Sequence, residues 1–147
     1  MLKEILLEFF ERELHKVKEE IFEYAEEASI WKIHSGIHNS AGNLCLHLVG
    51  NLHHFVGAIL GNTGYIRQRD DEFALQDVSR EVLFRSLDET ILMIKNTLQD
   101  FTEADFDKIY PLEKHGRTVT TRYMLLHLLT HLNYHLGQIN YHRRLIS

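Results

Sequence analysis

Apolar residues recur three or four positions apart, the spacing of an α-helix, in four segments of the chain. The first covers about residues 2–28, and we interpret the glutamates on its other faces as a solvated surface. The second begins at Asn39 or Ser40, because either side chain can cap the first free N–H groups of a helix. It extends to about residue 60, where the glycine-containing turn 61–64 ends it.

Polar stretches separate the remaining helices. We predict, in chain order, a loop over 65–73, a helix over 77–99, a capped turn at 102–105, a loop over 107–119, and a helix from Thr120 or Thr121 to about residue 145. No segment shows the two-residue alternation typical of a β-strand. Four amphipathic helices around one core predict an all-α fold, a four-helix bundle, with residues 1–147 as a single domain.

Composition narrows the class of function. The chain has 147 residues, a net charge of -5 and one cysteine, Cys45. The acidic excess disfavours nucleic-acid binding, which needs clustered Lys and Arg, so we expect a small-molecule partner. One cysteine excludes an intramolecular disulfide, a cysteine-rich zinc site and an iron–sulfur cluster within the chain. Because no run of about 18 uncharged apolar residues and no secretory signal pattern stands out, we expect a cytoplasmic protein without a membrane partner.

The chain contains eleven histidines, and those of the fourth predicted helix share one edge of its apolar face. At about 100° per residue, four of them fall within about 40° of His131 around the helix axis: His127, His131, His135 and His142. Residues four positions apart have neighbouring side chains, so His131 and His135 can both reach one metal ion. His127 lies further from the core, and His142 lies about 10 Å along the axis from His135, too far to share its ion.

The second predicted helix has a similar polar edge. His47, Asn51 and His54 lie on this edge, whereas His53 should point outward. If the two edges face each other, His47 or His54 supplies a third ligand to the histidine pair of the fourth helix. The alternative for each histidine is an ordinary polar side chain at the border of the core.

Other catalytic and metal-binding patterns are absent from the sequence. No histidine has Glu three residues before it, as a ferritin-like di-iron bundle requires, and His-Glu-x-x-His does not occur. There is no Gly-x-Ser-x-Gly elbow and no glycine-rich phosphate loop. Cys45 falls on the core side of its helix, so we expect a buried side chain rather than a nucleophile. Five histidines are expected on the surface or in loops: His15, His34, His38, His53 and His115.

Three motifs together resemble a known superfamily. The fourth helix reads His131-Leu-Asn-Tyr-His135-Leu-Gly-Gln138, and the second reads Asn39-Ser-Ala-Gly-Asn43-Leu-Cys-Leu-His47-Leu-Val-Gly-Asn51-Leu. The segment that follows the second helix reads Tyr65-Ile-Arg67-Gln-Arg69-Asp-Asp-Glu72-Phe. With these motifs the chain resembles, over essentially its whole length, the DinB/YfiT-like superfamily of metal-dependent enzymes, and within it an uncharacterised DinB-like subgroup.

The resemblance implies that His47, His131 and His135 bind one divalent ion, often nickel or zinc, in a four-helix bundle of the DinB/YfiT-like type. Several characterised members depend on a low-molecular-weight thiol, among them bacillithiol S-transferases and mycothiol-dependent isomerases. The resemblance also implies a homodimer. Four apolar residues in or near the first loop either form such an interface or cover the core: Ile30, Trp31, Ile33 and Ile37.

Three imidazole ligands leave coordination positions open, which is typical of a catalytic site. A divalent ion there lowers the pKa of a bound thiol or water and holds its conjugate base as a nucleophile. We therefore expect an enzyme similar to the thiol S-transferases. The alternatives are a metal-dependent hydrolase, a metal sensor or storage protein, and a non-enzymatic metal-binding or scaffold protein.

Four further residues are catalytic candidates. Asn51, one turn after His47, either hydrogen-bonds a ligand or bound water, or packs between helices. Arg67, Arg69 and Glu72 either line the mouth of the site and bind an anionic substrate, or form local ion pairs in a solvated loop.

Overall fold

The structure is a computed structural model that describes residues 1–146, which form helices and connecting loops without a β-strand. Four long helical rods run through it: α1 (Leu2–Phe22), α2 (Ala41–Leu52) continued by the π-helical η2 (His53–Ala58) and α3 (Ile59–Gly61), α5 (Arg80–Leu98) and α7 (Thr121–Ile146). Three short segments lie in the connections: the 3-10 helix η1 (Glu27–Trp31), α4 (Arg69–Ala74) and α6 (Glu103–Asp107). The described chain is all-helical, as the hydrophobic pattern predicts.

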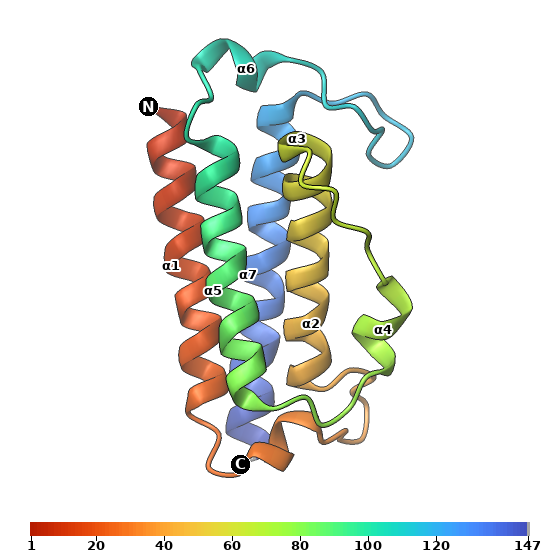
Figure 1. Cartoon of the computed structure of the whole chain (residues 1–147). Coiled ribbons are helices and arrows are strands. Elements are labelled where there is room, and N and C mark those ends of the chain that lie inside the picture. Colours follow the sequence, from red (N-terminus) through yellow and green to blue (C-terminus); the bar gives the residue numbers. More distant parts are fainter. Residues whose placement is uncertain (147) are drawn as a thin grey trace.

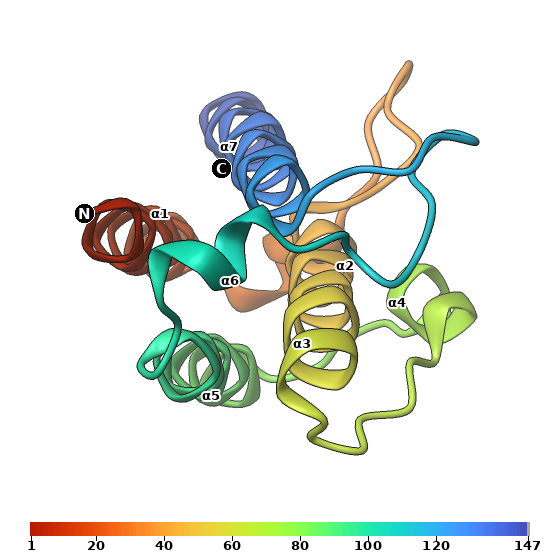
Figure 2. The ribbon, with the colours of Figure 1, turned by 90° about the horizontal axis from the view of Figure 1, so that it is seen from above.

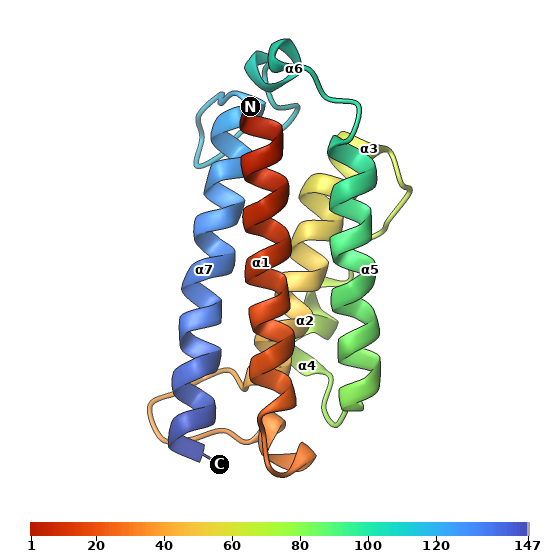
Figure 3. The ribbon, with the colours of Figure 1, turned by 90° about the vertical axis from the view of Figure 1, so that its left-hand side faces the viewer.

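The four rods lie side by side (Figures 1 and 2). α1 and α2 lie diagonally opposite, and both pack against α5 and α7; Figure 3 shows α1 between these two. α1 and α7 run in the same direction, since Asn133 Nδ2 donates to Glu13 at 2.7 Å and Asn140 Nδ2 donates to Glu20 at 2.7 Å, two turns further along both helices. α2 runs the opposite way (Figure 1), so its polar edge meets that of α7 in antiparallel orientation.

Hydroxyl side chains begin three of the rods, and the sequence predicts two of these caps, those at residues 40 and 120. The hydroxyls of Ser40, Ser79 and Thr120 accept from backbone N–H groups three residues later, at 3.1, 3.2 and 3.1 Å. The predicted turn after residue 101 is also capped, because Thr102 and Asp105 form a reciprocal capping box.

One core fills the space between the rods, and the predicted apolar stripes supply most of it. Burying one large aliphatic side chain is worth about 1.5–3 kcal/mol, so these stripes hold the rods together. The buried members from α1 and α7 are Leu6, Phe10, Leu14, Val17, Ile21, Leu125, Leu128, Leu132, Leu136 and Ile139. Cys45 is buried among them, as expected.

The first helix is shorter than the predicted 2–28, because the chain turns under the core after Phe22. Tyr24 is buried at this turn, and its hydroxyl lies 2.6 Å from His142 Nδ1 at the end of α7. This tertiary contact outweighs the helical pattern, which continues past residue 22 in the sequence.

The apolar residues of the first loop take different positions. Ile30 and Trp31 are buried and cover the end of the core. The Trp31 ring lies over Gly42, where a Cβ would come within 2.6 Å of it. Ile33 is exposed, and Ile37 is half-buried beside α7.

The predicted loop over 65–73 is wrong in its second half, where α4 forms a short helix against α2. The one buried residue of α4 is Glu72, so no apolar stripe reveals this helix in the sequence.

His53 does not point outward as predicted. It is half-buried, with Nε2 3.1 Å from Thr90 Oγ1, because α5 packs on that side of the rod.

Among the described helices, Ala41–Gly61 is long and apolar enough to cross a membrane by length and composition. This stretch is not a continuous apolar run in the sequence, because asparagines and histidines interrupt it. Half of this stretch is buried against the other rods, as in the core helix of a helical domain.

Candidate metal centre

His47 of α2 and the pair His131 and His135 of α7 converge on one focus between these antiparallel helices. His131 Nε2 lies 3.2 Å from His47 Nε2 and 3.1 Å from His135 Nε2. All three possible ligand atoms lie within 4.8 Å of one another. His47 is buried and the other two are half-buried. The structure thus brings the two polar edges together, and of the two α2 candidates it is His47, and not His54, that meets His131 and His135.

Their geometry and hydrogen bonding fit a divalent cation. Two nitrogens bound at about 2.0–2.1 Å lie about 2.8–3.0 Å apart in octahedral geometry and about 3.3–3.4 Å apart in tetrahedral geometry, and the two spacings above lie between these values. His47 Nδ1 donates to Glu72 Oε1 at 3.0 Å, and His135 Nδ1 donates to Gln138 Oε1 at 2.7 Å. Because these outer nitrogens carry the protons, the Nε2 lone pairs of both rings face the focus.

Burial favours the neutral form of two of these imidazoles, those of His131 and His47. Burial, followed by the neighbouring His135 and His47, lowers the pKa of His131 to about 3. Burial also lowers the pKa of His47, although the hydrogen bond to Glu72 opposes this shift. Neutral imidazole is the form that binds metals, so the cluster holds its ligands ready at neutral pH.

Glu72, a buried carboxylate on α4, supports His47 from outside the cluster. Arg67 donates to it twice, from Nε to Oε2 at 2.9 Å and from Nη2 to Oε1 at 3.0 Å. Such a paired and hydrogen-bonded carboxylate tolerates burial. Arg67 Nη2 also lies 3.4 Å from His47 Nδ1, since both donate to the same oxygen. Arg67 and Glu72 therefore form a buried ion pair rather than part of a solvated loop.

α2 makes room for this ion pair and anchors it. A Cβ on Gly50 would overlap the Glu72 carboxylate, so only glycine allows this close approach. Asn43 Nδ2 donates to the backbone carbonyls of Glu72 at 3.0 Å and Leu75 at 2.8 Å. Ser40 Oγ in turn donates to Asn43 Oδ1 at 2.7 Å. The start of α2 thus fixes the end of α4 that carries Glu72.

Asn51, one turn after His47 on α2, is 7 % exposed. Its Oδ1 has no hydrogen-bond partner within the described chain, and the same holds for His131 Nδ1. An unpaired buried polar atom costs about 1–3 kcal/mol, so the Asn51 amide oxygen is a candidate acceptor for a molecule bound near His47.

Arg69 and His142 lie outside the cluster. Arg69 is exposed, with its guanidinium 5.3 Å from the centre of the Phe73 ring. His142 is buried, and both of its ring nitrogens are engaged, one by the Tyr24 hydroxyl and the other by the Lys32 carbonyl at 2.9 Å. It holds the end of α7 to the loop below the core.

The other histidines named from the sequence also lie apart from the focus. His54 follows His47 by two turns, and its ring packs against Phe55 with centroids 4.7 Å apart. His127 packs against His115, with centroids 6.1 Å apart. Four of the predicted surface histidines are exposed: His15, His34, His38 and His115.

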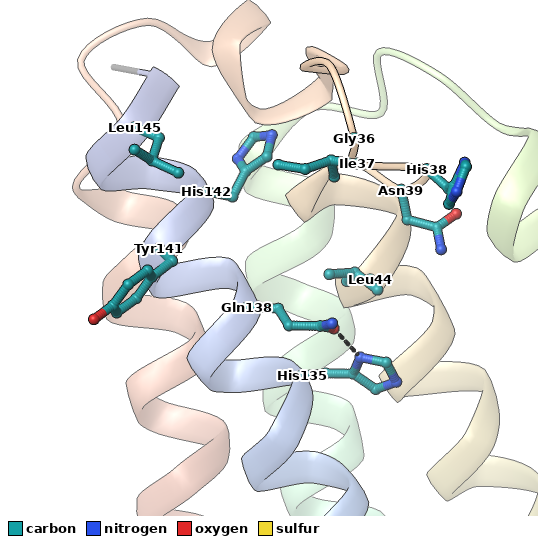
Figure 4. A pocket seen from close by; sticks show the side chains of 10 residues that line it. All are labelled: Gly36, Ile37, His38, Asn39, Leu44, His135, Gln138, Tyr141, His142 and Leu145. Carbon is teal, nitrogen blue, oxygen red and sulfur yellow. Dashed lines mark hydrogen bonds between the residues drawn. The ribbon is translucent and has the colours of Figure 1, made fainter.

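A cavity of about 360 Å³ adjoins the cluster along the seam between α2 and α7 (Figure 4). His135 lines it at one end, and Gln138 reaches toward that histidine. Leu44 of α2, the segment 36–39 and the last turns of α7 form the remaining walls. This volume lies within the range of small-molecule sites, about 300–1,000 Å³.

The sequence analysis did not predict that Gln138 and Glu72 hydrogen-bond to the histidines of the cluster. Gln138 follows His135 by three positions, a spacing that places side chains together on a helix, so its contact was readable. Glu72 was named only as a residue of the mouth. The signal for its true position was Gly50, a glycine inside an otherwise apolar helix.

A comparison with protein-family models matches residues 2–147 to a family described as "Protein of unknown function (DUF1572)". Comparisons with curated proteins and with solved structures gave no significant match. The family match covers nearly the whole chain, including every residue of the cluster and of its outer support.

Proposed function

The chain belongs to the DUF1572 family, and from its site we propose that it is a metal-dependent enzyme of the DinB/YfiT-like type, built on a four-helix bundle. One divalent ion, nickel or zinc, is bound by His47, His131 and His135. The reaction is transfer of a low-molecular-weight thiol to a small electrophilic molecule in the cytoplasm. The observation that carries the proposal is the convergence of three imidazoles, in which His131 Nε2 lies 3.2 Å from His47 Nε2 and 3.1 Å from His135 Nε2.

A divalent ion at this focus supplies a lowered pKa for a bound thiol or water. The chain's own residues orient the ligands and receive the bound molecule. Glu72 and Gln138 fix the rings of His47 and His135, so that their lone pairs stay aimed at the focus. Asn51 Oδ1, buried and unpaired among the described residues, is available to accept a hydrogen bond from that molecule.

The metal content of the tag-free protein, measured by elemental analysis, tests the site. We expect about one equivalent of a divalent ion in the wild type and its loss in His131→Ala. His127→Ala is the matched control, because His127 lies one turn away on the same helix but outside the cluster. No uptake of nickel or zinc by the wild type, or equal retention in His131→Ala, would overturn the proposal.

Turnover tests the reaction. The substrate is 1-chloro-2,4-dinitrobenzene, an uncharged electrophile, and the rate of thiol consumption is measured. We expect this reaction to require the metal and to be lost in His131→Ala. Metal-dependent hydrolysis of 4-nitrophenyl acetate without a thiol would favour a hydrolase instead. A metal-loaded protein that catalyses neither reaction would favour a sensor or storage protein.

A further inference from the structure

The cavity beside His135 has a chemical character that the metal ligands do not determine. Among the described residues that line it, none is Asp, Glu, Lys or Arg. Apolar side chains enter its walls from three elements: Ile37 from the segment 36–39, Leu44 from α2 and Leu145 from the end of α7 (Figure 4). An ionised ligand would give up part of its hydration here without gaining a charged side chain as a partner.

The polar side chains of the cavity are amides, imidazoles and one phenol, and some of them are already engaged. Gln138 accepts from His135 through Oε1, which leaves its amide N–H groups for a ligand. His142 uses both ring nitrogens within the fold, with Tyr24 and Lys32. A bound molecule therefore meets amide donors next to His135 and apolar walls further along α7.

Cations close to the site do not line this cavity. Arg67 is held by both carboxylate oxygens of Glu72, on the α4 side of the cluster. Arg69 is exposed on α4. Arg144 lies over the outer Tyr141 ring, 5.1 Å from its centre, and that ring points away from the cavity in Figure 4. The anionic substrate considered from the sequence thus meets no Lys or Arg side chain among the described residues of this cavity.

We propose that this cavity binds the second, non-thiol substrate, and that this substrate is an uncharged, largely apolar molecule with an oxygen acceptor such as a carbonyl beside Gln138. This inference rests on the proposed function, because it names the substrate class of the same site. A volume of about 360 Å³ equals about twelve water volumes of about 30 Å³, which suits one substituted ring or a short branched chain.

Benzamide and benzoate test the inference, because they have nearly the same shape and differ in charge. Both are titrated into the full-length protein in the presence of a chelator, which removes carboxylate–metal binding from the comparison. Backbone amide shifts in NMR spectra give the affinity and the location. We expect benzamide to bind at least about tenfold more tightly, with shifts at Gly36 and Leu44. Equal or tighter binding of benzoate, or shifts confined to other regions, would overturn the inference.

A charge-introducing variant strengthens the test. Leu145 lines the cavity and is 68 % exposed, so Leu145→Arg should fold normally and place a cation at the cavity's end. We expect it to reverse the preference in favour of benzoate. Leu126→Arg is the matched control, since Leu126 is exposed on the same helix but does not line the cavity. Unchanged affinities in Leu145→Arg would overturn the assignment of the cavity.

The experiments distinguish failure of the proposed function from failure of the cavity assignment. A protein that holds its ion but does not prefer benzamide would overturn the cavity assignment alone. A protein that prefers benzamide but takes up no ion would overturn the proposed function and leave an uncharged-ligand site.

Discussion

Gly50→Ala adds one methyl group at the point where Glu72 approaches α2. The new Cβ overlaps Glu72 Oε2 and lies 2.6 Å from its Cδ. Glu72 is 6 % exposed and is held by Arg67, so no open space receives the displaced carboxylate. We expect the carboxylate to move away from His47 Nδ1, which leaves the His47 ring without its fixed orientation.

The effect should be larger on metal binding than on folding. Loss of an outer partner of a metal-bound histidine weakens metal binding by about 10–100-fold, or about 1.4–2.7 kcal/mol. Overpacking beside Glu72 costs about 1–3 kcal/mol of stability, and the helix propensity of alanine returns about 1 kcal/mol. The free energy of unfolding should therefore change by no more than about 2 kcal/mol.

Competition with a chromophoric zinc chelator measures the zinc Kd, and urea unfolding measures stability. Gly137→Ala is the matched control, because Gly137 follows His135 by two residues on α7 and a Cβ there meets no atom within 4 Å. It should keep the wild-type Kd and gain about 1 kcal/mol of stability. An unchanged Kd in Gly50→Ala, or the same loss in both variants, would refute the role of Glu72.

Three further predictions concern stability and reactivity. Without metal, the free energy of unfolding should fall as the pH drops from about 6.5 toward 3, because the unfolded His131 takes up a proton that the folded side chain, with its pKa lowered to about 3, does not. Urea unfolding at about pH 7 and about pH 5 should show a smaller loss in His131→Asn, and equal losses would contradict this cause. Ser40→Ala removes the cap of α2 and should cost about 1–2 kcal/mol in urea unfolding; a cost near zero would contradict the capping role. Burial raises the pKa of the Cys45 thiol to about 12, so a thiol-reactive disulfide reagent should label it only in urea, and fast labelling of the native protein would count against its burial.

Helical periodicity predicted which histidines lie on the edge of each helix because that part of the argument is local, and the resemblance named His47 as the third ligand. The spacing of His131 and His135 places both rings on one edge, and His47 borders the core stripe of its own helix. If the two helices pack with these edges facing each other, the histidines of both helices meet. The structure confirms this for the cluster, whereas His54 lies two turns away and takes no part.

Helical periodicity could not predict that Glu72 supports His47, because this contact joins residues that are distant in the sequence. Glu72 and His47 are 25 positions apart, and α4 has no apolar stripe to mark it as a helix. The end of α1 was mispredicted for the same reason, since Tyr24 turns inward to meet His142, 118 positions away. Local patterns specify elements, whereas these contacts depend on how the elements are connected.

Anomalous X-ray diffraction from crystals grown with nickel or zinc tests the central claim most directly. We predict one strong peak at the absorption edge of the added metal, about 2.1 Å from the Nε2 atoms of His47, His131 and His135. A cluster without such a peak, or a peak held by other residues only, would contradict the metal centre on which the proposed function depends.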